Sequence, residues 1–129
     1  MANYTHVLSS GLFSLPANAK SLDWAVINDA PSTQSIRVTV FRLPPRAAKT
    51  AVVPGSVTFD LKPAHSFHNA NEVGVGKTFQ LGVDYELVVE TNDLRVLPSV
   101  RAWADSVNTA IAGTLISPGT FVDLTTRAN

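Results

Sequence analysis

The chain has 129 residues, no cysteine, and ten basic against ten acidic side chains, so its formal net charge is zero. This length allows one domain with a hydrophobic core of its own. The absence of cysteine excludes disulfides, thiolate metal sites and thiol nucleophiles, and no apolar run is long enough for a membrane span. Only 16% of the residues are charged, against about 25% in an average domain, and a neutral, sparsely charged surface favours association.

The first third of the chain predicts three strands separated by turn residues. Residues 4–15 predict a strand with a bulge at Ser9-Ser10-Gly11. Residues 22–28 are nearly all apolar, as in a strand that is covered on both faces. Residues 34–43 alternate, which predicts a strand with Ile36, Val38 and Val40 inward.

The middle of the chain contains more irregular sequence. Residues 44–55 carry three prolines and one glycine, which predicts an extended, polyproline-like segment. Residues 56–62 alternate cleanly and predict a strand, and residues 65–71 predict a short strand or a loop. Residues 74–78, GVGKT, resemble the end of a phosphate-binding loop but lack its first glycine at the required spacing, so we interpret them as a turn.

We expect residues 83–105 to form a central hairpin around which the other strands pair. Val83, Tyr85, Leu87 and Val89 alternate with acidic residues, and the turn residues 91–93 follow. Residues 97–112 fit two readings: a helix with Pro98 in its first turn and Gly113 just past its end, or two more strands. The regular spacing of turn signals elsewhere favours strands. Residues 120–125 predict a final strand.

Together, these elements predict an all-β protein. The expected fold is an antiparallel two-sheet β-sandwich, jelly-roll-like, with eight to nine short strands. The alternative is an antiparallel sheet with one helix at about 98–112. We expect one domain over residues 1–129, with residues 1–15 and 44–55 as candidate arms that reach a neighbouring subunit. Ala17-Asn18-Ala19 resembles a cleavage triplet, but no Lys or Arg precedes the apolar part, so we expect no signal peptide.

No set of residues predicts catalysis, a cofactor or a metal. His65, His68 and Glu72 lie within eight residues, but on a strand the two imidazoles point to opposite faces, so only a loop would bring the three together. Glu86 and Glu90 are too far apart on a strand for a glycosidase pair, at about 13 Å, and they fit a solvated acidic face better. No serine has a nucleophile-elbow context.

The charges are unevenly distributed along the chain. Residues 30–59 contain four basic residues and no acid, and residues 84–93 contain four acids and no base. This polarity predicts head-to-tail self-association, in which a positive region of one copy meets a negative region of the next. The predicted contact residues are Arg37, Arg42, Arg46, Lys49, Asp84, Glu86, Glu90 and Asp93.

The resulting hypothesis is a non-catalytic structural subunit that assembles with copies of itself, for example into an extracellular or spore-associated filament. In outline the chain resembles small β-sandwich subunits that build appendages, matrices or capsids, although it lacks the cysteines of cysteine-linked spore appendages. One alternative is a viral coat protein, the only reading with a nucleic-acid partner. A further alternative is a glycan- or ligand-binding module in which Trp103 stacks on the ligand.

Overall fold

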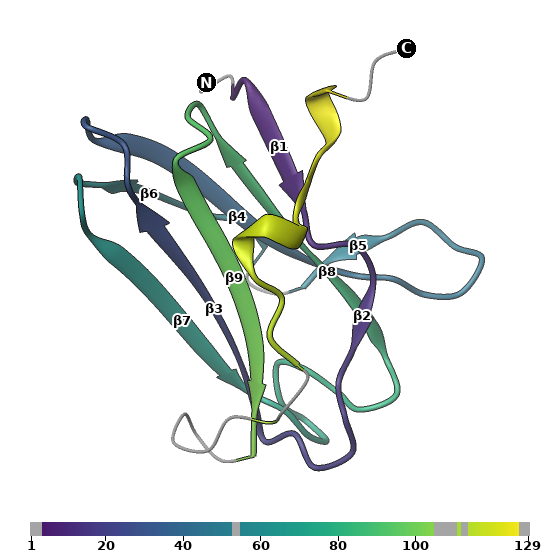
Figure 1. Cartoon of the computed structure of the whole chain (residues 1–129). Coiled ribbons are helices and arrows are strands. Elements are labelled where there is room, and N and C mark those ends of the chain that lie inside the picture. Colours follow the sequence, from purple (N-terminus) through teal and green to yellow (C-terminus); the bar gives the residue numbers. More distant parts are fainter. Residues whose placement is uncertain (1–3, 53–54, 105–110, 112–113, 127–129) are drawn as a thin grey trace.

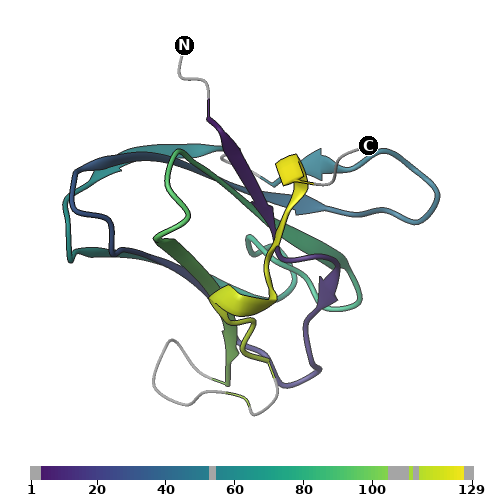
Figure 2. The same cartoon turned by 45° about the horizontal axis from the view of Figure 1, so that its top comes forward.

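The structure, a computed structural model, describes residues 4–52, 55–104, 111 and 114–126. Two antiparallel sheets pack face to face and form a β-sandwich, as the sequence predicts (Figure 1). Figure 2 shows the two sheets as separate layers, which the segments 29–33 and 62–65 join on one side. Among the described residues no helix is long and apolar enough to cross a membrane.

The larger sheet, sheet A, has seven strands and is built around β8. Strand β8 pairs with β1 and β2 on one side and with β4 on the other, while β10 pairs with β1, and β5 and β6 pair with β4. The strands are β1 (His6–Ser9), β2 (Phe13–Ser14), β4 (Gln34–Arg42), β5 (Thr50–Ala51), β6 (Val57–Leu61), β8 (Asp84–Thr91) and β10 (Val122–Asp123).

The smaller sheet, sheet B, has three strands in the order β7-β3-β9. These strands are β3 (Ser21–Asn28), β7 (Ser66–Glu72) and β9 (Val96–Trp103). Its inner face carries Leu22, Trp24 and Val26 of β3, which are at most 3% exposed and pack against the alternating apolar residues of sheet A. Phe59 of β6 and Phe67 of β7 stack with ring centroids 4.3 Å apart, and so connect the two sheets between their outer strands.

The expected central hairpin of residues 83–105 is wrong, although both of its strands exist. Strand β8 lies in the middle of sheet A, whereas β9 pairs with β3 in sheet B. The turn after Thr91 therefore crosses from one sheet to the other. Tyr85, Leu87 and Val89 do face the core, as their alternation predicts, but alternation identifies a strand's buried face and not its neighbours.

The sequence leaves residues 97–112 open between a helix and two strands, and the structure shows strand up to Trp103. Residues 96–103 form β9, and no α-helix occurs among the described residues of this region; residues 105–110, 112 and 113 of the two readings lie outside the described part. The final segment contains η1 (Pro118–Thr120), the two-residue β10 and η2 (Leu124–Thr126). Strand β10 pairs with β1, and the His6 imidazole contacts the Asp123 carboxylate at 2.8 Å.

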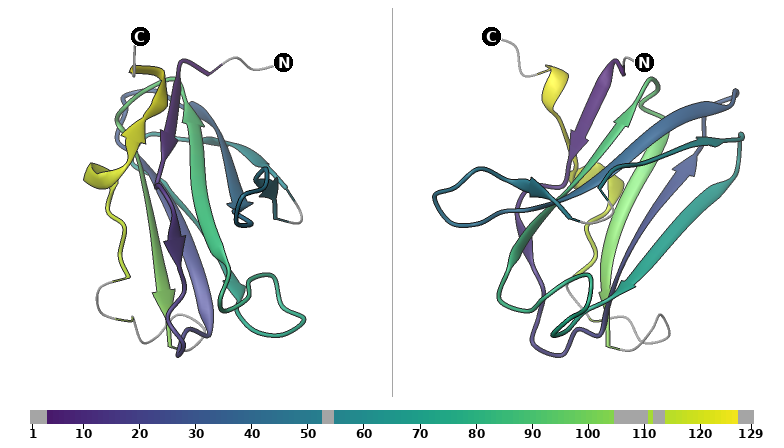
Figure 3. Two further views of the ribbon diagram at one scale, coloured as in Figure 1. Left: turned by 90° about the vertical axis from the view of Figure 1, so that its right-hand side faces the viewer. Right: turned by 180° about the vertical axis from the view of Figure 1, so that it is seen from behind.

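The two segments expected to be inter-subunit arms differ in their placement. Within residues 1–15, β1 and β2 both pair with β8 of the same chain, so this part belongs to sheet A. The expected bulge at residues 9–11 lies at the interruption between β1 and β2. Within residues 44–55, a hairpin joins β4 to β5 and projects from the body of the sandwich (Figures 1 and 3).

Candidate functional site

The charges that are separated along the sequence meet on paired strands. Arg37 of β4 lies directly opposite Glu90 of β8. Its Nε and Nη2 donate hydrogen bonds to the two carboxylate oxygens, each at 2.7 Å. These bonds raise the pKa of Arg37 above its ordinary value. A bidentate pair of this kind is strong for a partly exposed site, so the charges of Arg37 and Glu90 are matched within one chain.

Glu86 does not lie on a solvated acidic face, and this corrects the expectation. Its residue is 9% exposed. Lys49 donates to Oε1 at 2.9 Å, and the Ser9 hydroxyl donates to Oε2. The Lys49 ammonium also lies 4.5 Å from the centroid of the Phe41 ring, so this lysine covers two outward side chains of sheet A. The protein tolerates the buried Glu86 carboxylate because each of its oxygens accepts a hydrogen bond.

The other four predicted contact residues make no ion pair across the strands in the described structure. Asp93 binds Arg95 two residues further on, and this hydrogen bond lowers the pKa of Asp93 to about 2. Arg42 and Arg46 are exposed and Asp84 is half-buried. In the described part of the chain, no ion pair involves any of these last three. The structure therefore pairs five of the eight predicted contact residues within the same chain.

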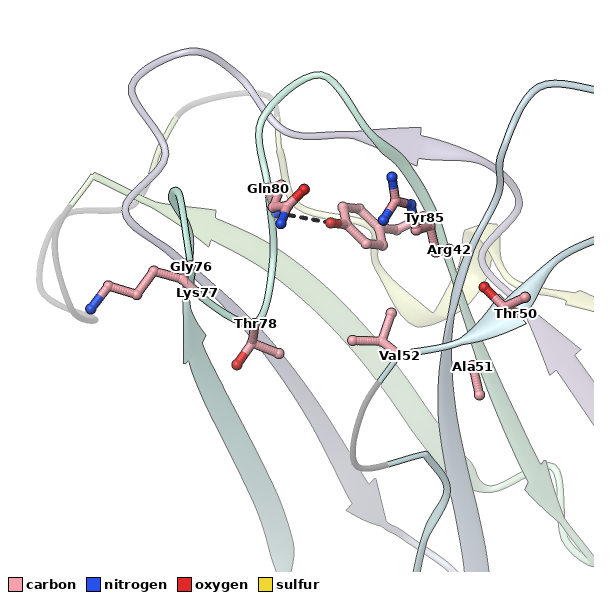
Figure 4. A pocket seen from close by; sticks show the side chains of 9 residues that line it. All are labelled: Arg42, Thr50, Ala51, Val52, Gly76, Lys77, Thr78, Gln80 and Tyr85. Atoms are coloured by element: carbon pink, nitrogen blue, oxygen red, sulfur yellow. Dashed lines mark hydrogen bonds between the residues drawn. The ribbon is translucent and has the colours of Figure 1, made fainter.

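A wide pocket of about 490 Å³ lies between the β4–β5 hairpin and the loop before β8 (Figure 4). Its charged lining is Arg42 and Lys77. Figure 4 shows the Lys77 side chain pointing away from Arg42, and Lys77 contacts Glu72 at 3.4 Å. The Tyr85 hydroxyl accepts a hydrogen bond from the Gln80 backbone N–H. Because Arg42 and Lys77 point apart, these two side chains do not bind one anion together.

A second hollow, of about 320 Å³, lies on the outer face of sheet B. It contains Trp103, the residue that the sequence offers for ligand stacking, together with Asp23 of β3 and His68 of β7. The imidazole Nδ1 of His68 lies 3.7 Å from Oδ2 of Asp23. The Arg101 guanidinium lies over the Trp103 ring, 5.4 Å from its centroid. Burial raises the pKa of Asp23, against the opposing effect of His68.

The candidate metal residues do not converge. His65 precedes β7 and donates from Nδ1 to the Pro63 carbonyl, while His68 faces Asp23 and Glu72 contacts Lys77. Within residues 4–52, 55–104, 111 and 114–126, no group of three or more His, Asp or Glu side chains is placed to hold a metal ion.

The two outer edges of sheet B differ in how they are protected. The Asn28 N–H bonds to the His65 carbonyl and the Val73 N–H to the Lys20 carbonyl. With the continuous β3–β7 register, these bonds place the odd-numbered backbone groups of β7 toward β3 and the even-numbered ones outward. In the described chain, the outward N–H groups of Ser66, His68 and Ala70 have no partner.

On β9 the outward N–H groups are all bonded or absent. Val96 donates to the Asp93 carbonyl, Val100 to the Ile116 carbonyl and Ala102 to the Thr114 hydroxyl. At the remaining outward position stands Pro98, which has no N–H. Sheet B is therefore closed along β9 and open along β7, which lies outermost in Figure 1.

Sequence reasoning missed both the open edge of β7 and the cluster around Asp23. A signal for the cluster was present, because Asp23 is the single charged residue in the apolar run 22–28. The open edge has no comparable local signal, since the sequence of β7 does not reveal that no other strand lies beside it.

Comparison with known proteins adds support for the fold alone. The sequence matches none of the protein-family models and none of the curated proteins with which it was compared. Among solved structures, the crystal structure of Thermotoga maritima 1070 is similar, with a TM-score of 0.51 and 15% sequence identity. The similarity covers 90% of this chain and 92% of that one. At this identity the likeness supports the β-sandwich and carries no function with it.

Proposed function

We propose that the protein is a non-catalytic β-sandwich subunit that self-associates by pairing β7 of one copy with β7 of another. The observation that carries this proposal is the unprotected edge of β7. The seven residues of β7 run in unbroken register with β3. They include no proline, lysine or bulge, the features that usually prevent an edge strand from pairing with another chain. The zero net charge of the chain removes long-range repulsion between copies.

The hydrogen-bonding groups of the open β7 edge are best matched by β7 of a second copy. The usable outward groups belong to Ser66, His68 and Ala70, because the Glu72 carbonyl already accepts from the Phe79 N–H. An antiparallel pair centred on His68 matches Ser66 of each copy with Ala70 of the other, and it uses every outward group of this stretch. Such pairing joins two three-stranded sheets into one continuous sheet of six strands.

This geometry favours a closed dimer over the head-to-tail filament. A contact of β7 with itself is isologous and closes after two copies. A filament through sheet B needs a second open edge, and the outer edge of β9 is occupied. The charge pairs Arg37–Glu90 and Lys49–Glu86 lie within one chain, so they offer little to a neighbouring copy or to nucleic acid. The dimer therefore serves as the building block of any larger assembly.

The test is the molar mass in solution, measured by size-exclusion chromatography with light scattering across a range of protein concentrations. We expect a dimer for the natural protein and a folded monomer for Ala70→Pro, because proline removes an outward N–H and leaves the ladder to β3 intact. The matched control is Ala70→Thr, which keeps the N–H and should remain dimeric. A natural protein that stays monomeric at every concentration, or that forms open-ended filaments, would contradict the β7 dimer.

A further inference from the structure

The two buried side-chain polar atoms that lack a hydrogen-bond partner in the described structure both belong to the hollow on the outer face of sheet B. They are Oδ1 of Asp23 and Nε1 of Trp103. Leaving such an atom unpaired destabilises the fold, so unpaired atoms of this kind need an explanation. One is an acceptor and the other a donor, and they come from neighbouring strands β3 and β9.

The two side chains lie on the same face of sheet B, and their unpaired atoms are covered in this structure, so a ligand contacts them only when a neighbouring side chain of the hollow moves. Asp23 lies opposite Arg101, and Trp103 is two residues beyond Arg101 on the same face of β9. Side chains in this diagonal relation have backbones about 7–8 Å apart, and long side chains bridge that gap. A ligand group that both donates and accepts is therefore able to contact Asp23 and Trp103 together.

The remaining lining of the hollow restricts the chemical class of the ligand. Asp23 and Arg101 carry opposite charges, which disfavours a strongly charged ligand. Ser99 adds a hydroxyl, and Ala25 and Leu115 add apolar surface. Leu115 is 50% exposed. The His68 side chain is 62% exposed beside Asp23, so it is able to move aside when a ligand enters.

We propose that this hollow binds a polyhydroxylated molecule of the size of one sugar unit, with a hydroxyl donating to Asp23 Oδ1 and a hydroxyl oxygen accepting from Trp103 Nε1–H. Hydroxyl groups combine donor and acceptor in one atom, and sugars present apolar C–H faces beside them, which suits Leu115 and Ala25. The hollow shares His68 with the β7 edge, but the two atoms proposed to bind the ligand lie on β3 and β9, so binding is expected in the monomeric Ala70→Pro variant as well as in the dimer.

The chain has two tryptophans, and this makes the test specific. In a ¹⁵N-labelled sample each indole N–H gives its own NMR signal. Trp24 is 3% exposed in the core and serves as the internal control. We titrate with D-glucose, D-galactose, D-mannose and N-acetyl-D-glucosamine, then with maltose to separate a free sugar from the end of a glycan. At least one sugar should shift the Trp103 signal saturably and leave that of Trp24 unchanged.

Two conservative variants separate binding from structure. Trp103→Phe keeps an aromatic ring but lacks the N–H, and Asp23→Asn keeps the shape but lacks the carboxylate. Each should weaken the affinity for the active sugar at least tenfold by calorimetry while the unfolding transition stays cooperative. No saturable shift with any sugar would overturn the proposal and leave a bound water as the partner of the two atoms. A response to glycine alone, a zwitterion with an amine and a carboxylate, would overturn it too.

Discussion

The two outer edges of sheet B have the same architecture and opposite chemistry. Along β9, each outward N–H from Val96 to Ala102 is bonded or replaced by the ring of Pro98. Along β7, the outward N–H groups of Ser66, His68 and Ala70 meet no protein group in the described structure. Both strands alternate side chains between the two faces of the sheet, β7 between exposed and half-buried and β9 between half-buried and buried, but the difference in edge protection lies in the backbone.

This contrast shows that edge protection depends on the register of a strand. A proline at an outward position removes one exposed donor and leaves the sheet intact, as Pro98 does in β9. The same residue one position away would remove a hydrogen bond to β3. A sheet with one protected and one open edge has a single direction in which to grow, and two copies that meet there close the edge for both.

The largest effect should come from proline on the inner register of β7. Asn69→Pro removes an N–H that faces β3 and leaves the Trp24 carbonyl without its partner, so we expect a loss of about 2–4 kcal/mol in the free energy of unfolding. Urea denaturation followed by circular dichroism measures this loss. Ala70→Pro, one residue further, is the matched control. Equal stability losses in the two variants would mean that the register assigned to β7 is wrong.

An intermediate effect should follow from removing part of the cover on β9. The Thr114 hydroxyl accepts from the Ala102 N–H at 3.2 Å and donates to the Ile111 carbonyl at 2.7 Å. Thr114→Val abolishes both bonds, and we expect a loss of about 1–2 kcal/mol. Thr58→Val, on the exposed face of β6, is the control and should change stability by less than about 0.5 kcal/mol. Indistinguishable stabilities for the two valine variants would show that Thr114 does not hold the edge closed.

The smallest effect on edge protection should come from restoring the missing donor on β9. Pro98→Ala adds one outward N–H, but Val100 and Ala102 on the same edge remain bonded. The Pro98 ring is fully buried, so we expect its truncation to cost about 1–2 kcal/mol of stability and to leave the molar mass in light scattering unchanged. Oligomers larger than those of the natural protein would show that the proline alone protects this edge.

The sequence predicts the buried faces of this fold better than its connections. The alternation in residues 84–90 correctly places Tyr85, Leu87 and Val89 in the core. It does not reveal that β8 and β9 belong to different sheets, since a turn at residues 91–93 fits a hairpin and a crossing between sheets equally well. The same limit affects Glu86, whose partner Lys49 lies 37 residues away.

For the candidate sites too, the sequence predicts which face a side chain lies on but not which residues of other strands lie beside it. Trp103 stands out in the sequence as an outward aromatic residue of its strand, and the structure places it on that face. Its neighbours Asp23 and His68 come from two other strands, which only the order β7-β3-β9 brings beside it. The charged segments show the converse: Arg37 and Glu90 are 53 residues apart and form a bidentate pair, so polarity along the chain is cancelled by strand pairing.

The central place of β8 in sheet A has a consequence for biosynthesis. As the ribosome makes the chain from its N-terminus, β1, β2 and β4 emerge well before residues 84–91, which are the strand that all three pair with. The β4–β6 hairpin is able to form early, but β1, β2 and β4 gain their common partner only once β8 has been synthesised, and β10 completes sheet A still later. The nascent protein therefore has a long period in which unpaired strands need shielding, and a chaperone that holds extended apolar segments should increase its folding yield.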